Sequence, residues 1–216
     1  MTLKLHYHPL SAFCQKVLIA LYENDTPFET VFVDFANSES REAFLKLWPV
    51  GQFPALDDTA RDHFVPESSI IIEYLAQHYP GKVTLIPDDP DLARQTRFRD
   101  RFFDLHVAVP MQKIVTDRIR PAGKHDPYGV EQAKARLHTA LALIDEGVQA
   151  KTWAMGESFT MADCAAAPAL AYANMAMPFT DTYTNAGKYL QRLMARPSFA
   201  RAWAEAEPYR ANFPKA

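Results

Sequence analysis

Residues 11–14, SAFC, carry the side chains of this chain that are best placed for thiol chemistry. The preceding residues, 3–8, alternate apolar and polar side chains with the period of a half-buried strand, and Pro9 ends that strand because it has no N–H to donate. Apolar residues then recur every three or four positions as far as Leu21, which predicts a helix beginning near residue 11 or 12. The first turn of a helix has unpaired N–H groups and partial positive charge, so it stabilises an anion such as a thiolate.

Ser11 and Cys14 have the spacing of a C-x-x-C redox motif whose first, more exposed cysteine is replaced by serine. A serine does not ionise without a base, but its hydroxyl can donate a hydrogen bond to a bound ligand's thiolate and lower the pKa of that thiol. Capping the helix is the commoner role for a serine at such a position. Cys14 lies on the apolar side of the helix, and we expect a buried, inert thiol there.

Two further segments could bind a ligand. Gln52, Phe53 and Pro54 precede a short strand, and a cis peptide before Pro54 would expose the backbone N–H and C=O of Phe53, although most X–Pro bonds are trans. Glu67 and Ser68 stand at the start of a helix. They could simply cap it, or they could hold the α-amino and α-carboxylate groups of a ligand.

Other motifs are structural or missing. Thr160 and Asp163 have the spacing of a helix capping box. The seven histidines show no metal-ligand spacing, and no glycine-rich phosphate loop or G-x-S-x-G motif occurs. We therefore expect no metal site.

Composition and charge bound the possible partners. The net charge of −3 implies no broad basic surface for nucleic acid. Residues 1–80 hold five Lys/Arg against eleven Asp/Glu, so an anionic ligand bound there would depend on backbone amides, or on cations from the second half or a partner. The sequence has two cysteines, no apolar run after a basic start, and no apolar stretch long enough to span a bilayer. These features predict a cytoplasmic protein without a membrane segment.

The first half of the chain mixes strand and helix patterns. Strands are predicted at 3–8, 28–33, 54–56 and 63–65, and helices from residue 11 or 12, over 41–48, and from residue 68 or 69 to a stop at 79–81. On the last helix we place Ile70 and Ile71 along the buried side. The β-α-β-α-β-β-α order predicts an α/β domain over residues 1–80, with a four-stranded sheet flanked by helices.

The second half is helical throughout. Residues 81–90 form a proline-rich linker. Helical spacing then predicts a long helix over 91–120 with a kink at Pro110, followed by helices over 130–148, 160–173, 187–196 and 198–207. Residues 91–216 should therefore make an all-helical domain.

Four motifs in this order carry a resemblance to a known family: HPLSAFCQKV at 8–17, VGQFPAL at 50–56, ESSIIIEYL at 67–75 and GESFTMAD at 156–163. The chain resembles the cytosolic glutathione S-transferase family over essentially its whole length, and in particular its serine-type, bacterial-like members. The resemblance implies a thioredoxin-like domain over 1–80, a helical domain over 91–216, a homodimer, and glutathione as co-substrate in a detoxification reaction.

The resemblance also assigns roles to residues. Ser11 corresponds to the serine that activates the glutathione thiol. The glutathione-binding residues that it implies are Phe13, Gln52 for the glycyl end, Phe53 for the cysteinyl backbone, the cis-proline Pro54, and Glu67 with Ser68 for the γ-glutamyl end. Thr160 and Asp163 match the family's capping box, and Arg41 is the nearest candidate for the basic residue often found on the second helix.

The chain departs from the family pattern at two places. Tyr7 lies near the position of a catalytic tyrosine in other classes, but its phase with Leu3 and Leu5 favours a packed side chain. Trp48-Pro49 stands where many members have Asn-Pro, which leaves the subclass open.

The resulting hypothesis is a glutathione transferase whose thiolate, held by Ser11, attacks a hydrophobic electrophile near Phe103, Met111 and the loop around Phe13. One alternative is a glutathione-dependent oxidoreductase or peroxidase that uses Cys14. Another is a non-catalytic module of the same fold that binds protein partners. A nucleic-acid binder is disfavoured by the charge.

Overall fold

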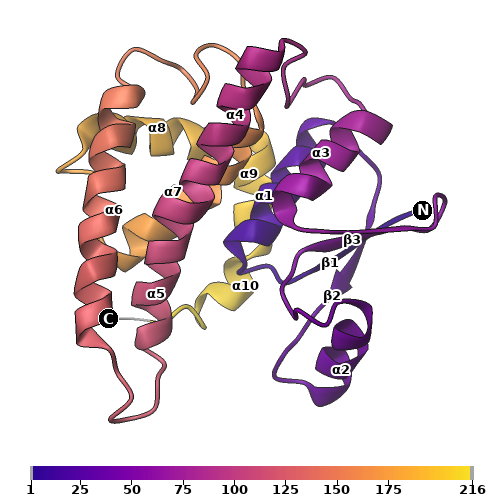
Figure 1. Cartoon of the computed structure of the whole chain (residues 1–216), viewed down its shortest axis with the longest axis horizontal. Coiled ribbons are helices and arrows are strands. Elements are labelled where there is room, and N and C mark those ends of the chain that lie inside the picture. The colour runs from indigo at the N-terminus through magenta and orange to yellow at the C-terminus, as the bar shows by residue number, and fades with distance from the viewer. Residues whose placement is uncertain (1, 215–216) are drawn as a thin grey trace.

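The computed structural model describes residues 2–214 and divides into a sheet domain and a helical domain (Figure 1). The sheet domain has the order β1 (Leu3–Tyr7), α1 (Ala12–Glu23), β2 (Glu29–Phe32), α2 (Ser38–Leu47), β3 (Ala55–Asp58), β4 (His63–Pro66) and α3 (Ser68–His78). The strands lie in the order β2-β1-β3-β4, with β1 parallel to β2 and antiparallel to β3. This is the thioredoxin-like arrangement that was expected.

The helical domain follows from residue 90. It comprises α4 (Pro90–Phe103), a π-helical segment η1 (Asp104–Ala108), α5 (Val109–Asp117), α6 (Pro127–Gly147), α7 (Met161–Ala176), α8 (Thr184–Ala195), α9 (Pro197–Glu205) and α10 (Glu207–Arg210). Within residues 2–214, no helix combines the length and the apolar character needed to cross a membrane.

The long helix expected over 91–120 is interrupted by a π-helical turn and ends at Asp117. The irregularity occupies the turn before Pro110, which itself lies in the first turn of α5. Proline lacks an N–H and its ring crowds the carbonyl one turn earlier, so the wider π turn accommodates it. The π turn also shifts the register of the following residues, which matters for the site described below.

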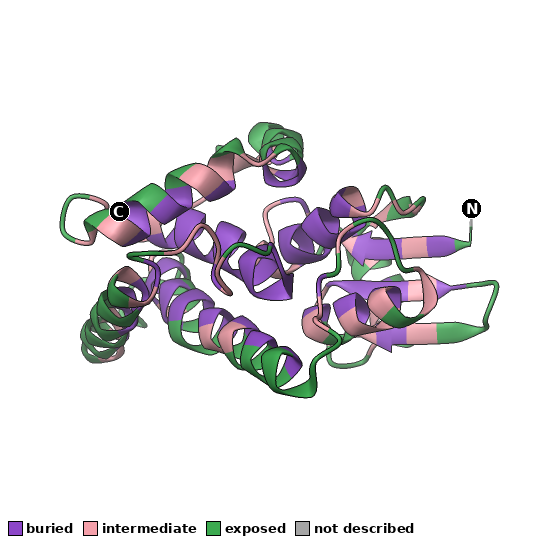
Figure 2. Ribbon diagram, turned by 90° about the horizontal axis from the view of Figure 1, so that it is seen from above, coloured by how far each residue is buried: buried purple, intermediate pink, exposed green. Residues whose placement is uncertain are grey.

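Helices α1 and α7 form the centre of the protein, where buried residues concentrate (purple in Figure 2). Every residue of α7 from Met161 to Tyr172 is buried, and its many alanines allow α1 and α4 to pack closely against it. The predicted capping box is confirmed: the Thr160 N–H donates to Asp163 Oδ2 at 2.9 Å. Asp163 Oδ1 also accepts from the Ala154 N–H and the Tyr189 hydroxyl, so this buried carboxylate ties three segments together.

A buried charged cluster joins the two domains. Lys16 on α1 is 1% exposed, and its Nζ lies 2.7 Å from Asp100 Oδ1 and 2.8 Å from Asp104 Oδ2. The same ammonium donates to Ser69 Oγ on α3 at 2.8 Å, and the Ser69 hydroxyl donates to Asp100 Oδ2 at 2.6 Å. One cation thus compensates two carboxylates from the helical domain, and removing it would leave both without a counter-ion.

We predict that Lys16→Met lowers the free energy of unfolding by about 3–5 kcal/mol, because breaking a buried ion pair leaves uncompensated charge. Urea unfolding followed by circular dichroism measures this. The matched control is Lys82→Met, since Lys82 pairs with Asp25 on the surface at 2.7 Å. The control should unfold like the wild type. Equal effects of the two substitutions would show that the cluster does not hold the domains together.

Candidate active site

Ser11 is the N-cap of α1, at the point where β1 passes into the helix. Its φ and ψ of −76° and 121° are extended, and its Oγ accepts a hydrogen bond from the Cys14 N–H at 3.3 Å. A cap uses a lone pair of the hydroxyl oxygen, so the O–H proton, which is also within reach of the Cys14 thiol, can still donate to a ligand. Capping the helix and donating to a ligand are therefore compatible roles for this one serine.

Cys14 is sealed beneath the cap. It is 0% exposed, and its Sγ accepts from the His8 N–H at 3.4 Å. Burial raises the pKa of the Cys14 thiol to about 12. Cys164 is buried as well, and burial raises the pKa of its thiol well above the ordinary value. As expected from the sequence, Cys14 is a packed side chain, and it has no access to a disulfide substrate.

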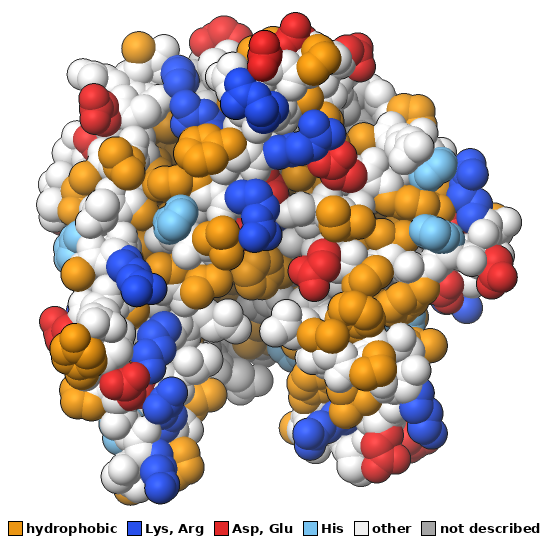
Figure 3. All heavy atoms as spheres, viewed as in Figure 1, with side chains coloured by type: hydrophobic (Ala, Val, Ile, Leu, Met, Phe, Trp, Pro, Cys, Tyr) orange, Lys and Arg blue, Asp and Glu red, His pale blue; other side chains and the backbone are white. Residues whose placement is uncertain are grey.

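A cavity of about 550 Å³ lies between the sheet domain and the π-helical turn, and we call it the first pocket. Figure 3 shows the molecule hollowed between the helical domain and the part of the sheet domain that carries α2. All six residues that were expected to bind glutathione line the first pocket: Phe13, Gln52, Phe53, Pro54, Glu67 and Ser68. Segments separated by up to 55 positions in the sequence, from Phe13 to Ser68, therefore converge on one cavity.

The backbone of these residues has two unusual features. The Phe53–Pro54 peptide is cis, as the family resemblance implied. Glu67 has φ of +73°, although it is not glycine, and its side chain does not cap α3. A side chain held in the left-handed region costs about 1–3 kcal/mol, and such residues cluster at functional sites. This backbone leaves the Glu67 carboxylate at the pocket, beside the N-terminus of α3.

A second cavity, of about 340 Å³, contains Ser11 and is called the second pocket. Its apolar walls come from α5 and from the C-terminal segment, including Met111, Val115 and Phe213. Phe13 and Phe53 line both pockets, so the two adjoin at these rings. Ser11 therefore stands next to the residues that were expected to bind glutathione and lines an apolar chamber.

Phe103 does not belong to this chamber, and its expected place near the electrophile is corrected here. It is 3% exposed and borders a separate cavity with Phe98, Phe102 and Leu143. The π turn starts directly after Phe103 and shifts the helical register. Side chains before and after the turn therefore point to different sides of the helix. Met111, which follows the turn, does line the second pocket.

Two other residues differ from expectation, Arg41 and Ile70, whereas Tyr7 agrees with it. Arg41 is exposed on α2 and lines neither pocket, whereas Arg101 on α4 lines the first. Ile70, expected in the core, is 53% exposed and forms part of the first pocket. Tyr7 is half-buried against the core and lines neither pocket, in keeping with a packing role.

Most of the pocket residues that the sequence analysis missed come from the helical domain, and one, His8, follows β1 and lines the second pocket. Arg101 and Asp104 line the first pocket, and Tyr172 and Phe213 the second. No local motif marks them, because their role depends on how two domains meet. Among residues 2–214, no three His, Cys, Asp or Glu side chains lie together in a way that could hold a metal ion.

Comparison with known proteins identifies the family of both domains. The family model described as "Glutathione S-transferase, N-terminal domain" matches residues 5–83, and the model described as "Glutathione S-transferase, C-terminal domain" matches residues 127–206. A curated relative, glutathione S-transferase hmp2 of Hypomyces subiculosus, is 28% identical over 95% of this chain and all of its own length.

Solved structures show the same two-domain fold. A glutathione S-transferase of Methylobacillus flagellatus with GSH bound has a TM-score of 0.84 at 26% identity, covering 93% of this chain and 98% of its own. A second, from Methylobacterium radiotolerans in complex with glutathione sulfonate, has a TM-score of 0.80 at 26% identity, covering 99% and 95%. The fold is that of the two-domain glutathione-binding enzymes. The chain belongs to the glutathione S-transferase family.

We predict that neither cysteine reacts in the folded protein. Iodoacetamide at mildly alkaline pH should leave Cys14 and Cys164 unmodified, because both are buried and their thiols have raised pKa values. The same reagent after unfolding in urea should modify both, which serves as the control. Rapid alkylation of Cys14 in the folded state, read by mass spectrometry, would contradict the assignment of an inert thiol.

Proposed function

We propose that this protein is a glutathione transferase that conjugates the glutathione thiolate to a hydrophobic electrophile, with Ser11 as the residue that activates the thiol. The observation that carries the proposal is the position of Ser11. It caps α1 where the pocket lined by Glu67 and Ser68 adjoins the apolar second pocket.

Glutathione would occupy the first pocket along its length. The α-carboxylate of the γ-glutamyl unit would bind the Ser68 hydroxyl and the free N–H groups that begin α3, and its ammonium would face Glu67. The backbone of Phe53 would pair with the cysteinyl unit, and Gln52 would meet the glycyl end. This placement brings the sulfur to the N-terminus of α1.

At that position the sulfur would be held as a thiolate. The Ser11 hydroxyl can donate to it, and the positive end of α1 favours its negative charge. Both effects act on the ionised form and lower the pKa of the bound thiol below its value in free glutathione. The electrophile would lie in the second pocket, against Phe13 and Met111.

The rival enzymatic function has little support. A thiol oxidoreductase or peroxidase needs an accessible thiolate, and Cys14 is fully buried. A non-catalytic module would keep the fold but show no turnover, so an activity measurement separates it from the transferase. The two free, buried cysteines suit a reducing compartment, and we propose a cytoplasmic location.

We predict that Ser11→Ala lowers kcat for an aryl halide by about 10- to 100-fold, since a hydrogen bond to a charged group contributes about 1.5–3 kcal/mol. The dissociation constant for glutathione, measured by calorimetry, should change far less. Ser11→Thr retains a hydroxyl and is the matched control, with most of the activity restored. The pKa of bound glutathione, read from thiolate absorbance, should rise in Ser11→Ala. If the alanine variant conjugates as fast as the wild type, Ser11 is not the activating residue.

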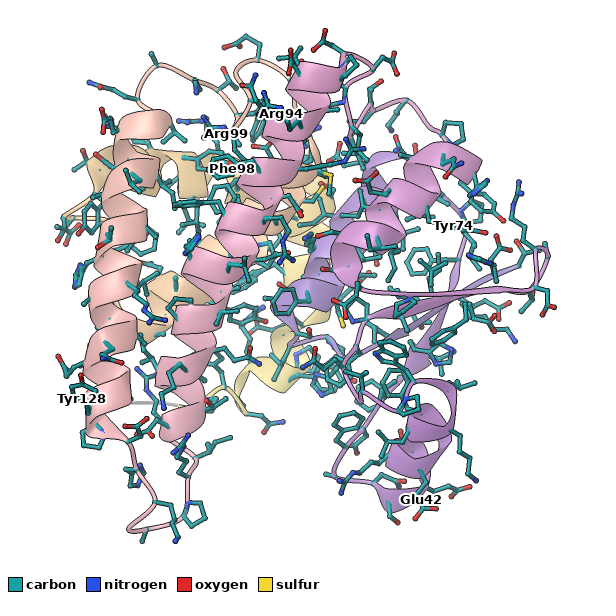
Figure 4. All side chains as sticks on the ribbon, viewed as in Figure 1. Glu42, Tyr74, Arg94, Phe98, Arg99 and Tyr128 are labelled. Carbon is teal, nitrogen blue, oxygen red and sulfur yellow. The ribbon has the colours of Figure 1, made fainter. Side chains whose placement is uncertain are left out.

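We also propose that the protein is a homodimer that pairs through the exposed face of α4. Phe98, 63% exposed, projects from α4 close to Arg94 and Arg99 (Figure 4), and Leu143 on α6 is 55% exposed beside it. The acidic first half of the chain complements these basic side chains. A two-fold pairing would cover the apolar residues and bring unlike charges together.

We therefore expect light scattering to give twice the 24.4 kDa chain mass, and Phe98→Glu to shift the protein toward the monomer. Tyr128→Glu is the control, because Tyr128 is 75% exposed and lies at the other end of the helical pair in Figure 4. A monomeric wild type at micromolar concentration would refute the pairing.

A further inference from the structure

His8 is a titratable residue beside Ser11 that the roles described so far leave unused. It follows the last residue of β1 and lines the second pocket together with Ser11. Its ring stacks on Phe53 with centroids 5.9 Å apart and planes at 21°, lies 5.3 Å from the ring of Phe32, and meets Tyr209 edge-on at 5.7 Å. Contacts on several sides fix the plane of the imidazole.

The tautomer of His8 follows from one hydrogen bond. The Leu10 backbone N–H donates to His8 Nδ1 at 3.2 Å, so Nδ1 is the acceptor and a neutral ring carries its proton on Nε2. Burial lowers the pKa of His8, which keeps the ring neutral at physiological pH. Nε2 makes no hydrogen bond to residues 2–214, and it is not among their sealed polar atoms. A ligand can therefore reach a fixed, neutral Nε2–H donor.

The other polar groups of the second pocket are engaged or lie at its edge. The Thr116 hydroxyl donates to the Gln112 carbonyl at 2.8 Å, and Tyr172, whose hydroxyl accepts from the Gln15 amide at 2.9 Å, is only 1% exposed. Gln112 and Asn212 are exposed. The Ser11 hydroxyl is proposed to donate to the glutathione sulfur. His8, whose ring is fixed by its aromatic neighbours, is then the donor available to a ligand in the second pocket.

We propose that His8 is a second catalytic residue of this transferase, donating its Nε2–H to the oxygen of an electrophile in which a carbonyl is conjugated to the carbon under attack. The proposal rests on the function proposed above and names the substrate class: α,β-unsaturated ketones and aldehydes. A neutral donor suits this task because it stabilises an oxyanion without transferring its own proton.

The reaction proceeds as a conjugate addition. The thiolate sulfur forms a bond to the β-carbon, the alkene π pair shifts toward the carbonyl, and the carbonyl oxygen becomes an enolate that accepts from His8 Nε2–H. Water then supplies the proton to the α-carbon, which balances the proton released to solvent when the thiol ionised. The hydrogen bond strengthens as negative charge develops on oxygen, so it acts on the transition state more than on the bound substrate.

Substrates without such an oxygen should not need His8. In the reaction with benzyl chloride the sulfur forms a bond to the benzylic carbon, the C–Cl bond breaks, and chloride leaves with the electron pair. Benzylideneacetone has a similar aromatic body but carries a conjugated carbonyl. The ratio of kcat/KM for these two substrates in one preparation reports on the donor and is independent of the fraction of protein that is folded.

Two substitutions separate the two nitrogens of the ring. His8→Asn keeps an acceptor within reach of the Leu10 N–H but removes the donor at the Nε2 position. His8→Gln keeps an amide N–H near that position, and both variants lose the ring stacking equally. We expect His8→Asn to lower kcat/KM for benzylideneacetone relative to benzyl chloride by about 10- to 100-fold, at or below the usual effect of losing an oxyanion donor. His8→Gln should recover most of the ratio, and His6→Phe, on the same strand but outside both pockets, should leave it unchanged.

The outcomes distinguish this inference from the proposed function. Equal losses on both substrates in His8→Asn, no loss on either, or a wild type that conjugates benzyl chloride but not the ketone would each overturn the role of His8 while the transferase stands. A raised pKa of the bound glutathione thiol in His8→Asn would show that His8 donates to the sulfur. That result would also overturn the role of His8 toward the carbonyl oxygen. A wild type that binds glutathione but conjugates neither substrate, nor an aryl halide, would refute the transferase itself.

Discussion

Helix α1 is buried along almost its entire length, so every polar side chain on it must find a partner inside the protein. Those partners come largely from the other domain. Gln15 donates to the Tyr172 hydroxyl, Lys16 is held by the two aspartates of the helical run, and Glu23 is clamped by Arg196 at 2.6 Å. The sheet and helical domains are therefore fixed around one helix, and the pockets form where its N-terminus emerges between them.

The same constraint separates the two residues of the S-x-x-C segment. The fourth position of a first helical turn faces the interior here, so Cys14 is sealed and its thiol stays protonated. The first position is the cap and faces the pocket. The sequence posed capping and activation as alternatives for Ser11, but accepting from the Cys14 N–H and donating to a ligand use different parts of one hydroxyl.

Much of the fold and of the candidate site could be predicted from the sequence wherever a local pattern determines the structure. The order of strands and helices along the chain, the capping box at Thr160 and the six expected residues that line the first pocket all follow from short motifs and from the family resemblance that they carry. Periodicity failed where the helix changes type: it could not locate the π turn, and so it placed Phe103 beside the electrophile. It also assigned Ile70 to the core, because an apolar side chain that lines a pocket has the same pattern as one that is buried. Arg101 and Asp104 carry no local signal, since their position depends on the contact between domains.

The second pocket differs from the first in how its walls are attached. Part of it is made by the C-terminal segment, where Phe213 stacks on Tyr172 at 5.4 Å and Arg118 donates to the Pro214 carbonyl at 3.0 Å. The first pocket contains no residue of the C-terminal segment and is built from the loop before β3, the starts of α1 and α3, and the helical run from Arg101 to Val109. Substitutions in the C-terminal segment can therefore remodel the shape of the second pocket during evolution, while the lining of the first pocket is left undisturbed. A family with this construction can diversify its chemistry at the periphery without destabilising its core.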